Sequence, residues 1–114
     1  MRGGIGSHEM KIENAGDTIR VLAVEELNTA TATTFQESVQ EAVTESIRHI
    51  EVDLSGMVLL DSCGLGTLVA LRKMFGRRGG SVRLLNPAPQ VLQMLELTRL
   101  HRILEVVRLP AAPG

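Results

Sequence analysis

Residues 50–66 have the sequence IEVDLSGMVLLDSCGLG, and this stretch decides the fold. Apolar and polar residues alternate at its start, which predicts a strand over residues 49–54. A Ser-Gly pair then interrupts the strand, and the apolar run 57–60 is either the approach to a turn or a continuation of the strand. Asp61 and Ser62 follow, directly before apolar residues at helical spacing, so we expect a strand, a turn and a helix in succession.

The predicted helix begins after Asp61 or Ser62 and runs to about Arg77. Arginines and a lysine crowd its last turns, where cations suit the negative end of the helix dipole. Gly79-Gly80 ends it, because glycine readily adopts positive φ. The residues expected to face the core are Leu65, Leu68, Val69 and Phe75, with Leu71 and Met74 beside them.

The rest of the chain alternates between predicted strands and helices. Strands are expected over residues 19–24, 81–85 and 103–107, with a short edge strand over 11–13 joined by a turn at 14–17. Helices are expected over 31–47, capped by Asn28 or Thr29, and from Asn86 as N-cap with Pro87 at the first helical position, with a break at 97–101.

This alternation predicts an α/β fold in a single domain over residues 10–108. We expect a small mixed sheet of four to five strands with helices packed mainly on one face. Residues 1–9 are expected to form a flexible N-terminal lead, and residues 109–114 a flexible tail.

The composition argues against several classes of function. A formal net charge of -1 and an aromatic share of 2% argue against a nucleic-acid partner, which needs basic and base-stacking surfaces. The apolar runs are far shorter than the roughly 20 residues of a membrane span, so we expect no membrane insertion. The single cysteine excludes an internal disulfide, which suits a reducing, cytoplasmic setting.

Catalytic and metal chemistry also find little support in the sequence. The three histidines have neither each other nor the cysteine at ligand spacing, so we expect no metal site. Residues 60–64 lack the first glycine of a nucleophile elbow, and Gly64-Leu65-Gly66 lacks the lysine of a phosphate loop. We expect Cys63 to be a small buried thiol that packs under the turn rather than a nucleophile.

The start of the helix is the remaining candidate site. Capping alone would account for Asp61 and Ser62, because both side chains carry an oxygen that accepts from free backbone N–H groups. Ser62 would also present a hydroxyl at the positive end of the helix dipole, where a phosphate is stabilised. Such a phosphate would add a charge of about -1.5 to -2 beside Asp61, which would oppose docking of a partner.

Two segments resemble the signature of STAS domains, the family of bacterial anti-sigma-factor antagonists. They are VDLSG at residues 52–56 and LDSCGLG at residues 60–66. GGSVRLLNP at 79–87 and LELTRL at 95–100 resemble the second half of the same family, so the similarity covers about residues 10–107. The Asp-Ser-x-Gly-Leu-Gly motif between a strand and a helix is the specific part of this resemblance.

The resemblance implies a partner-switching regulator of transcription, not an enzyme. In this family the serine after the aspartate is phosphorylated by the anti-sigma factor, a serine kinase, and a phosphatase resets it. The unphosphorylated antagonist binds the kinase and frees the sigma factor. The kinase holds ATP and Mg²⁺, so no cofactor is expected here. Carried over to this sequence, the phosphate acceptor is Ser62, and the partner-binding residues are Asp61, Ser62, Cys63, Gly64, Leu65, Gly66 and Asn28.

Two positions depart from the family pattern. Cys63 stands where Ser or Thr is frequent, which leaves Ser62 as the only hydroxyl acceptor in the turn. Many members have Gly-Glu-Leu-Asp where this chain has Glu25-Glu26-Leu27-Asn28, and this difference bears on kinase recognition. The alternatives are a STAS interaction subunit of a lipid-transport or signalling assembly that is never phosphorylated, and a redox sensor or thiol enzyme based on Cys63. The sequence also leaves a weak homodimer open.

Overall fold

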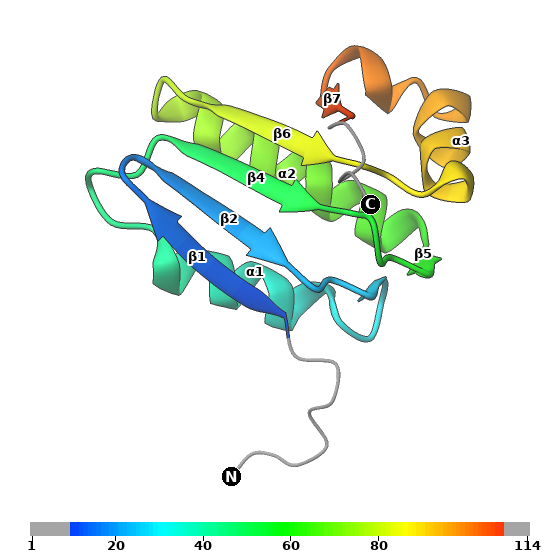
Figure 1. The fold of residues 1–114 in the computed structure, drawn as a ribbon, viewed down its shortest axis with the longest axis horizontal. Coiled ribbons are helices and arrows are strands. Elements are labelled where there is room, and N and C mark those ends of the chain that lie inside the picture. The colour runs from blue at the N-terminus through cyan, green and yellow to red at the C-terminus, as the bar shows by residue number, and fades with distance from the viewer. Residues whose placement is uncertain (1–9, 109–114) are drawn as a thin grey trace, which may run out of the picture.

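A computed structural model describes residues 10–108 of the chain (Figure 1). The predicted lead at residues 1–9 and the predicted tail at 109–114 lie outside the described residues. In chain order the elements are β1 Lys11–Ala15, β2 Thr18–Leu22, β3 Glu26–Leu27, α1 Ala32–Ala42, β4 His49–Asp53, β5 Leu59–Leu60, α2 Ser62–Arg77, β6 Ser81–Leu85, α3 Pro89–Leu97, the 3₁₀ helix η2 Leu100–Arg102 and β7 Glu105–Val107.

The main sheet has five strands in the order β1-β2-β4-β6-β7. β1 and β2 form an antiparallel hairpin, and the other neighbours are parallel. Figure 1 shows α1 and α2 lying along one face of this sheet, while α3 lies beyond the end of β6. The predicted α/β fold, a mixed sheet of four to five strands with helices mainly on one face, is therefore confirmed.

The core lies between the sheet and the two long helices. Alternate residues of β2, β4 and β6 are buried and meet the apolar sides of α1 and α2, as the period of two in a strand requires. The opposite face of the sheet is polar: Glu51 on β4 pairs with Arg20 at 2.7 Å and with Arg83 at 3.6 Å. The largest fully buried side chains are Phe75, Ile19, Leu27, Ile47, Ile50, Leu54, Met57, Leu68, Leu71, Leu84, Leu95 and Leu104.

The first helix is shorter than predicted. It ends at Ala42, and Val43 is already extended (φ -81°, ψ 121°), so the prediction of helix as far as Ile47 was wrong. Two β-branched residues in succession, Val43 and Thr44, disfavour continuation of the helix. Ile47 nevertheless keeps the apolar spacing, because the loop before β4 places it in the core with no exposed surface.

The third helix starts later than predicted. Asn86 adopts a left-handed conformation (φ 51°), and its N–H donates to the Val107 carbonyl at 2.8 Å. Asparagine tolerates this conformation better than most residues, and the Asn86 backbone extends the pairing between β6 and β7 by one hydrogen bond. The helix begins at Pro89 with Ala88 as N-cap, and the predicted start at Asn86-Pro87 was wrong.

A second, two-stranded sheet lies beside the start of α2. β3 pairs in parallel with β5, with Glu26 opposite Leu59 and Leu27 opposite Leu60. The apolar run 57–60 is therefore a turn approach that ends in a short strand, and β3 was not predicted. This small sheet places the segment after β3 next to the turn that starts α2.

Candidate functional site

The start of α2 is fixed by Asp61. Its backbone is extended (φ -117°, ψ -172°), and its Oδ1 accepts from the Gly64 N–H at 2.9 Å, which is an N-cap. The Asp61 carbonyl accepts from the Leu65 N–H, also at 2.9 Å, as the first bond of the helix. Of the two caps that the sequence allowed, Asp61 is the one that forms, and Ser62 becomes the first helical residue.

The second carboxylate oxygen of Asp61 binds a different part of the chain. Oδ2 accepts from both the N–H and the hydroxyl of Thr29, each at 3.1 Å. Thr29 lies in the turn between β3 and α1, so one carboxylate joins this turn to the start of α2. Asp61 therefore ties together two segments that are 32 residues apart in the sequence.

These hydrogen bonds favour the ionised form of Asp61. The Gly64 N–H makes the largest contribution, and the N–H and hydroxyl of Thr29 and the Cys63 N–H add to it, against a partial desolvation that acts the other way. Together they lower the pKa of Asp61 below its ordinary value. The carboxylate is therefore negative at neutral pH, directly beside Ser62.

Asn28 shapes the neighbouring turn. Its Oδ1 accepts from the N–H groups of Ala30 and Thr31 at 3.0 and 3.2 Å, and its carbonyl accepts from the Ala32 N–H at 2.9 Å. These bonds order the turn before α1, but the N-cap of the helix is Thr31, without a side-chain cap hydrogen bond, so the predicted cap at Asn28 was wrong. Thr29, the other predicted cap, binds Asp61 instead.

Gly64 lies against the backbone of β3. A Cβ placed on Gly64 would lie 1.9 Å from the Leu27 carbonyl oxygen and 2.8 Å from Leu60 Cδ1. Only glycine allows this approach without a shift of the backbone. A Cβ on Gly66 would meet nothing within 4 Å, so the second glycine of the motif has no such packing reason among the described residues.

Ser62 and Cys63 form the exposed surface of the turn. The prediction that Cys63 is a buried thiol was wrong: it lies at the second helical position on the outer side, while Gly64 and Leu65 face inward. Ser62 presents its side chain at the positive end of a 16-residue helix. Within the motif, Ser62, Cys63 and Gly66 are thus exposed, while Gly64 and Leu65 are buried beneath them.

Sequence reasoning missed two apolar side chains beside this turn. Val58 is 64% exposed and Leu59 is 51% exposed. The signal was present in the apolar run 57–60, because a short segment with one buried side cannot bury four consecutive apolar residues. Met57 is buried, and Val58 and Leu59 point outward next to Asp61 and Ser62.

Two other features, a metal-binding cluster and a membrane-spanning helix, are absent from the part of the chain that the structure describes. Within residues 10–108, no cluster of three or more His, Cys, Asp or Glu side chains has the arrangement to hold a metal ion. None of the helices within the same range has both the length and the apolar character needed to cross a bilayer.

Comparison with known proteins identifies the family. The STAS domain model matches residues 9–110. A candidate anti-sigma factor antagonist of Thermotoga maritima is 31% identical over 91 residues, which cover 79% of this chain and 80% of that protein. A crystal structure of a candidate anti-sigma factor antagonist from T. maritima superposes with a TM-score of 0.80 at 26% identity, covering 89% of this chain and 86% of that one.

Unphosphorylated SpoIIAA, an anti-sigma factor antagonist, has the same fold at lower identity. Its TM-score is 0.77 at 17% identity, with 90% of this chain and 89% of that chain covered. The family match over residues 9–110 covers all of the residues that the structure describes. The chain belongs to the STAS domain family.

Proposed function

We propose that this chain is an anti-sigma-factor antagonist that binds an anti-sigma factor with serine kinase activity, and that phosphorylation of Ser62 switches this binding off. One observation carries the proposal. Asp61 caps α2 with its own carboxylate, and this leaves Ser62 as an exposed first residue of the helix. Its hydroxyl is therefore accessible to a kinase without any loss of capping.

The same geometry explains how phosphate would act. A phosphate on Ser62 lies near the free N–H groups and positive dipole end of α2, so the fold tolerates it. It also places a charge of about -1.5 to -2 beside the ionised Asp61. Dense negative charge at this position opposes a docked partner through like-charge repulsion and the cost of desolvation.

The surface around Ser62 suits a protein partner. Val58 and Leu59 are exposed apolar side chains on the segment that enters the turn. Exposed apolar residues beside polar ones are typical of protein-binding surfaces. We assign the contact surface to Val58, Leu59, Ser62 and Cys63, with Gly64 and Leu65 shaping the turn from below.

Asn28 changes the charge of this surface but keeps its shape. The Asn28 Oδ1 makes the turn hydrogen bonds that an aspartate oxygen would make in the related family pattern. The substitution therefore removes one negative charge near Asp61 and Thr29 while the turn persists. Glu25, where the family pattern has Gly, adds a negative charge to the same segment, so a kinase for this chain would meet the acidic charge at residues 25 and 26 and not at residue 28.

The relatives support this assignment. Structures of SpoIIAA are known in unphosphorylated and phosphorylated forms, and both share this fold. The proposed role places the chain in a bacterial cytoplasm, acting in transcription regulation as a phosphoprotein without catalytic activity of its own. A phosphatase would then return Ser62 to its free hydroxyl.

Incubation with the cognate kinase and ATP, followed by mass spectrometry of peptides, tests the proposal. We expect one phosphate on Ser62 in the wild type and none in Ser62→Ala. Ser55→Ala is the matched control, because Ser55 is an exposed serine in the turn after β4. Phosphorylation of Ser62 should persist in this variant. A chain that binds the kinase but acquires no phosphate on Ser62 would contradict the switch and favour a constitutive STAS interaction subunit.

A further inference from the structure

A pocket of about 450 Å³ opens between the loop after β2 and the first half of α1. This volume lies in the range of about 300–1,000 Å³ that is typical of small-molecule sites. Val24 and Phe35 contribute to its wall and are each only 3% exposed, while Thr34 and Ser38 add hydroxyls one helical turn apart. Ala23, Glu25, Glu26 and Thr31 also line the pocket.

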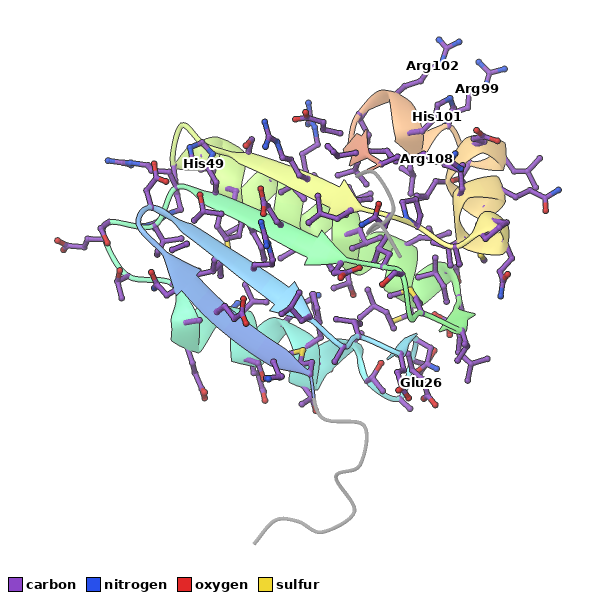
Figure 2. The ribbon with its side chains drawn as sticks, viewed as in Figure 1. Glu26, His49, Arg99, His101, Arg102 and Arg108 are labelled. Carbon is purple, nitrogen blue, oxygen red and sulfur yellow. The ribbon has the colours of Figure 1, made fainter. Side chains whose placement is uncertain are left out.

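The charge around this pocket has one sign. Of the described residues that line it, Glu25 and Glu26 carry charge, and both are acidic. Figure 2 shows Glu26 at the end of the molecule where α1 begins, whereas Arg99 and Arg102 project from the region of η2, well away from it. An apolar wall with acidic residues at hand fits an apolar molecule that carries a positive group, and it disfavours carboxylates and phosphates.

We propose that this pocket binds a small amphipathic amine, with its apolar part against Val24 and Phe35 and its ammonium group near Glu26. An amine gains attraction from a carboxylate, while the neutral hydroxyls of Thr34 and Ser38 carry no charge that would repel it. The site is distinct from the Asp61-Ser62 turn, and the proposal does not depend on phosphorylation or on a kinase.

The pocket is nevertheless connected to that turn by hydrogen bonds. The Thr31 hydroxyl donates to the Glu26 carbonyl at 3.1 Å and accepts from the Asn28 N–H at 3.1 Å. Thr29, which follows Asn28, donates its N–H and its hydroxyl to Asp61. An amine that contacts Thr31 should therefore disturb the Thr29 amide as well as the pocket lining.

Titration of the ¹⁵N-labelled chain with 4-phenylbutylamine, followed by amide chemical shifts, tests the site. We expect saturable shifts at Ala23, Thr34 and Ser38, with a smaller shift at Thr29. The matched anion 4-phenylbutanoate should bind about tenfold more weakly because its charge has the opposite sign. Equal affinity for the two compounds, shifts centred elsewhere, or no saturation by millimolar concentrations would each overturn the proposal.

Paired variants separate this pocket from nonspecific binding. Thr33 and Thr34 are both exposed on α1, but only Thr34 lines the pocket, so Thr34→Phe should weaken amine binding at least tenfold and Thr33→Phe should leave it unchanged. Glu26→Gln should weaken binding of the amine about two- to fivefold and leave the neutral 4-phenylbutanol unaffected. Glu37→Gln, at an exposed α1 position outside the lining, is its control, and an equal effect of the two charge variants would contradict a role for Glu26.

Discussion

The two ends of α2 use the same packing device for different results. At the start, a Cβ on Gly64 would lie 1.9 Å from the Leu27 carbonyl oxygen. Just past the end, a Cβ on Gly80 would lie 1.5 Å from the Arg48 carbonyl oxygen. Each glycine lets the backbone lie against a neighbouring segment. Both ends of the helix are therefore held by close backbone contacts that a Cβ atom would prevent.

The ends differ in what covers them. At the C-terminal end, Arg78 donates to the Ile47 carbonyl at 2.8 Å and to the Thr44 carbonyl, and Arg48 donates to the Arg78 carbonyl at 2.9 Å. At the N-terminal end, Asp61 makes the internal bonds and leaves Ser62 exposed. The C-terminal end of the helix is therefore held by hydrogen bonds to the loop before β4, while the N-terminal end is held by Asp61 and also exposes Ser62.

Replacing either close-packed glycine should have the largest effect on stability. Gly64→Ala and Gly80→Ala should each lower the free energy of unfolding by about 3 kcal/mol, because a methyl group must displace backbone atoms. Urea denaturation, with the midpoint compared at equal slope, measures the change.

Two other glycines provide the control for this result. A Cβ on Gly66 or Gly76 would meet nothing within 4 Å, and both lie inside α2. Gly66→Ala and Gly76→Ala should therefore raise the free energy of unfolding by about 0.5–1 kcal/mol through the higher helix propensity of alanine. If Gly64→Ala behaved as Gly66→Ala does, the close contact with β3 would not matter to stability.

Charge on Ser62 should affect binding and spare the fold. Ser62→Asp should weaken the complex with the cognate anti-sigma factor about 30- to 150-fold, a loss of about 2–3 kcal/mol. Its own free energy of unfolding should stay within about 0.5 kcal/mol of wild type, as expected for an exposed residue. Calorimetric titration gives the affinity, and Ser62→Asn separates charge from shape. Equal losses in the Asp and Asn variants would remove the electrostatic explanation.

Replacing Arg78 should do the opposite of Ser62→Asp: it should lower stability and leave partner binding unchanged. Arg78→Ala should lower the free energy of unfolding by about 1–2 kcal/mol, because two backbone carbonyls lose a donor. Binding to the partner should remain as in wild type, since this end of α2 is remote from Ser62. Arg77→Ala, at an exposed position in the last turn, should cost less than half as much. A binding defect in Arg78→Ala would show that the two ends are coupled.

The smallest effect should come from acid titration of Asp61. The folded pKa of Asp61 lies below its unfolded value of about 3.9, so the stabilisation is complete above that value and is lost as pH falls through the folded pKa. The stability difference between wild type and Asp61→Asn should thus be largest near pH 6 and shrink below about pH 4. Urea midpoints across this range test it, and a difference independent of pH would show that ionisation of Asp61 adds nothing.

The sequence predicted the main sheet because its strands carry a clear alternation. Ile50 and Val52 in β4, and their counterparts in β2 and β6, are buried as expected. Gly79, with φ +74°, ends α2 as predicted. β3 and β5 have two residues each, which is too short for any periodicity, so their pairing could only emerge from the tertiary structure.

The details of the candidate site depended on one choice that the sequence left open. An α-helix turns by about 100° per residue, so the buried residues Leu65 and Leu68 fix which side faces inward, whichever residue is the cap. The structure selects Asp61 as the cap, and Cys63 lies on the exposed side of the helix, where a buried thiol was expected. Both Asp and Ser are good caps, and Thr29, which distinguishes them here, is distant in sequence.

The clamp formed by Asp61 also has a consequence for the rate of recognition. Because its two oxygens hold separate segments, the turn is already ordered before any partner arrives. A protein that docks there spends little conformational entropy on ordering the loop. Ordering of the loop should then not limit the rate of association, and a phosphate at this position would act mainly by shortening the lifetime of the complex.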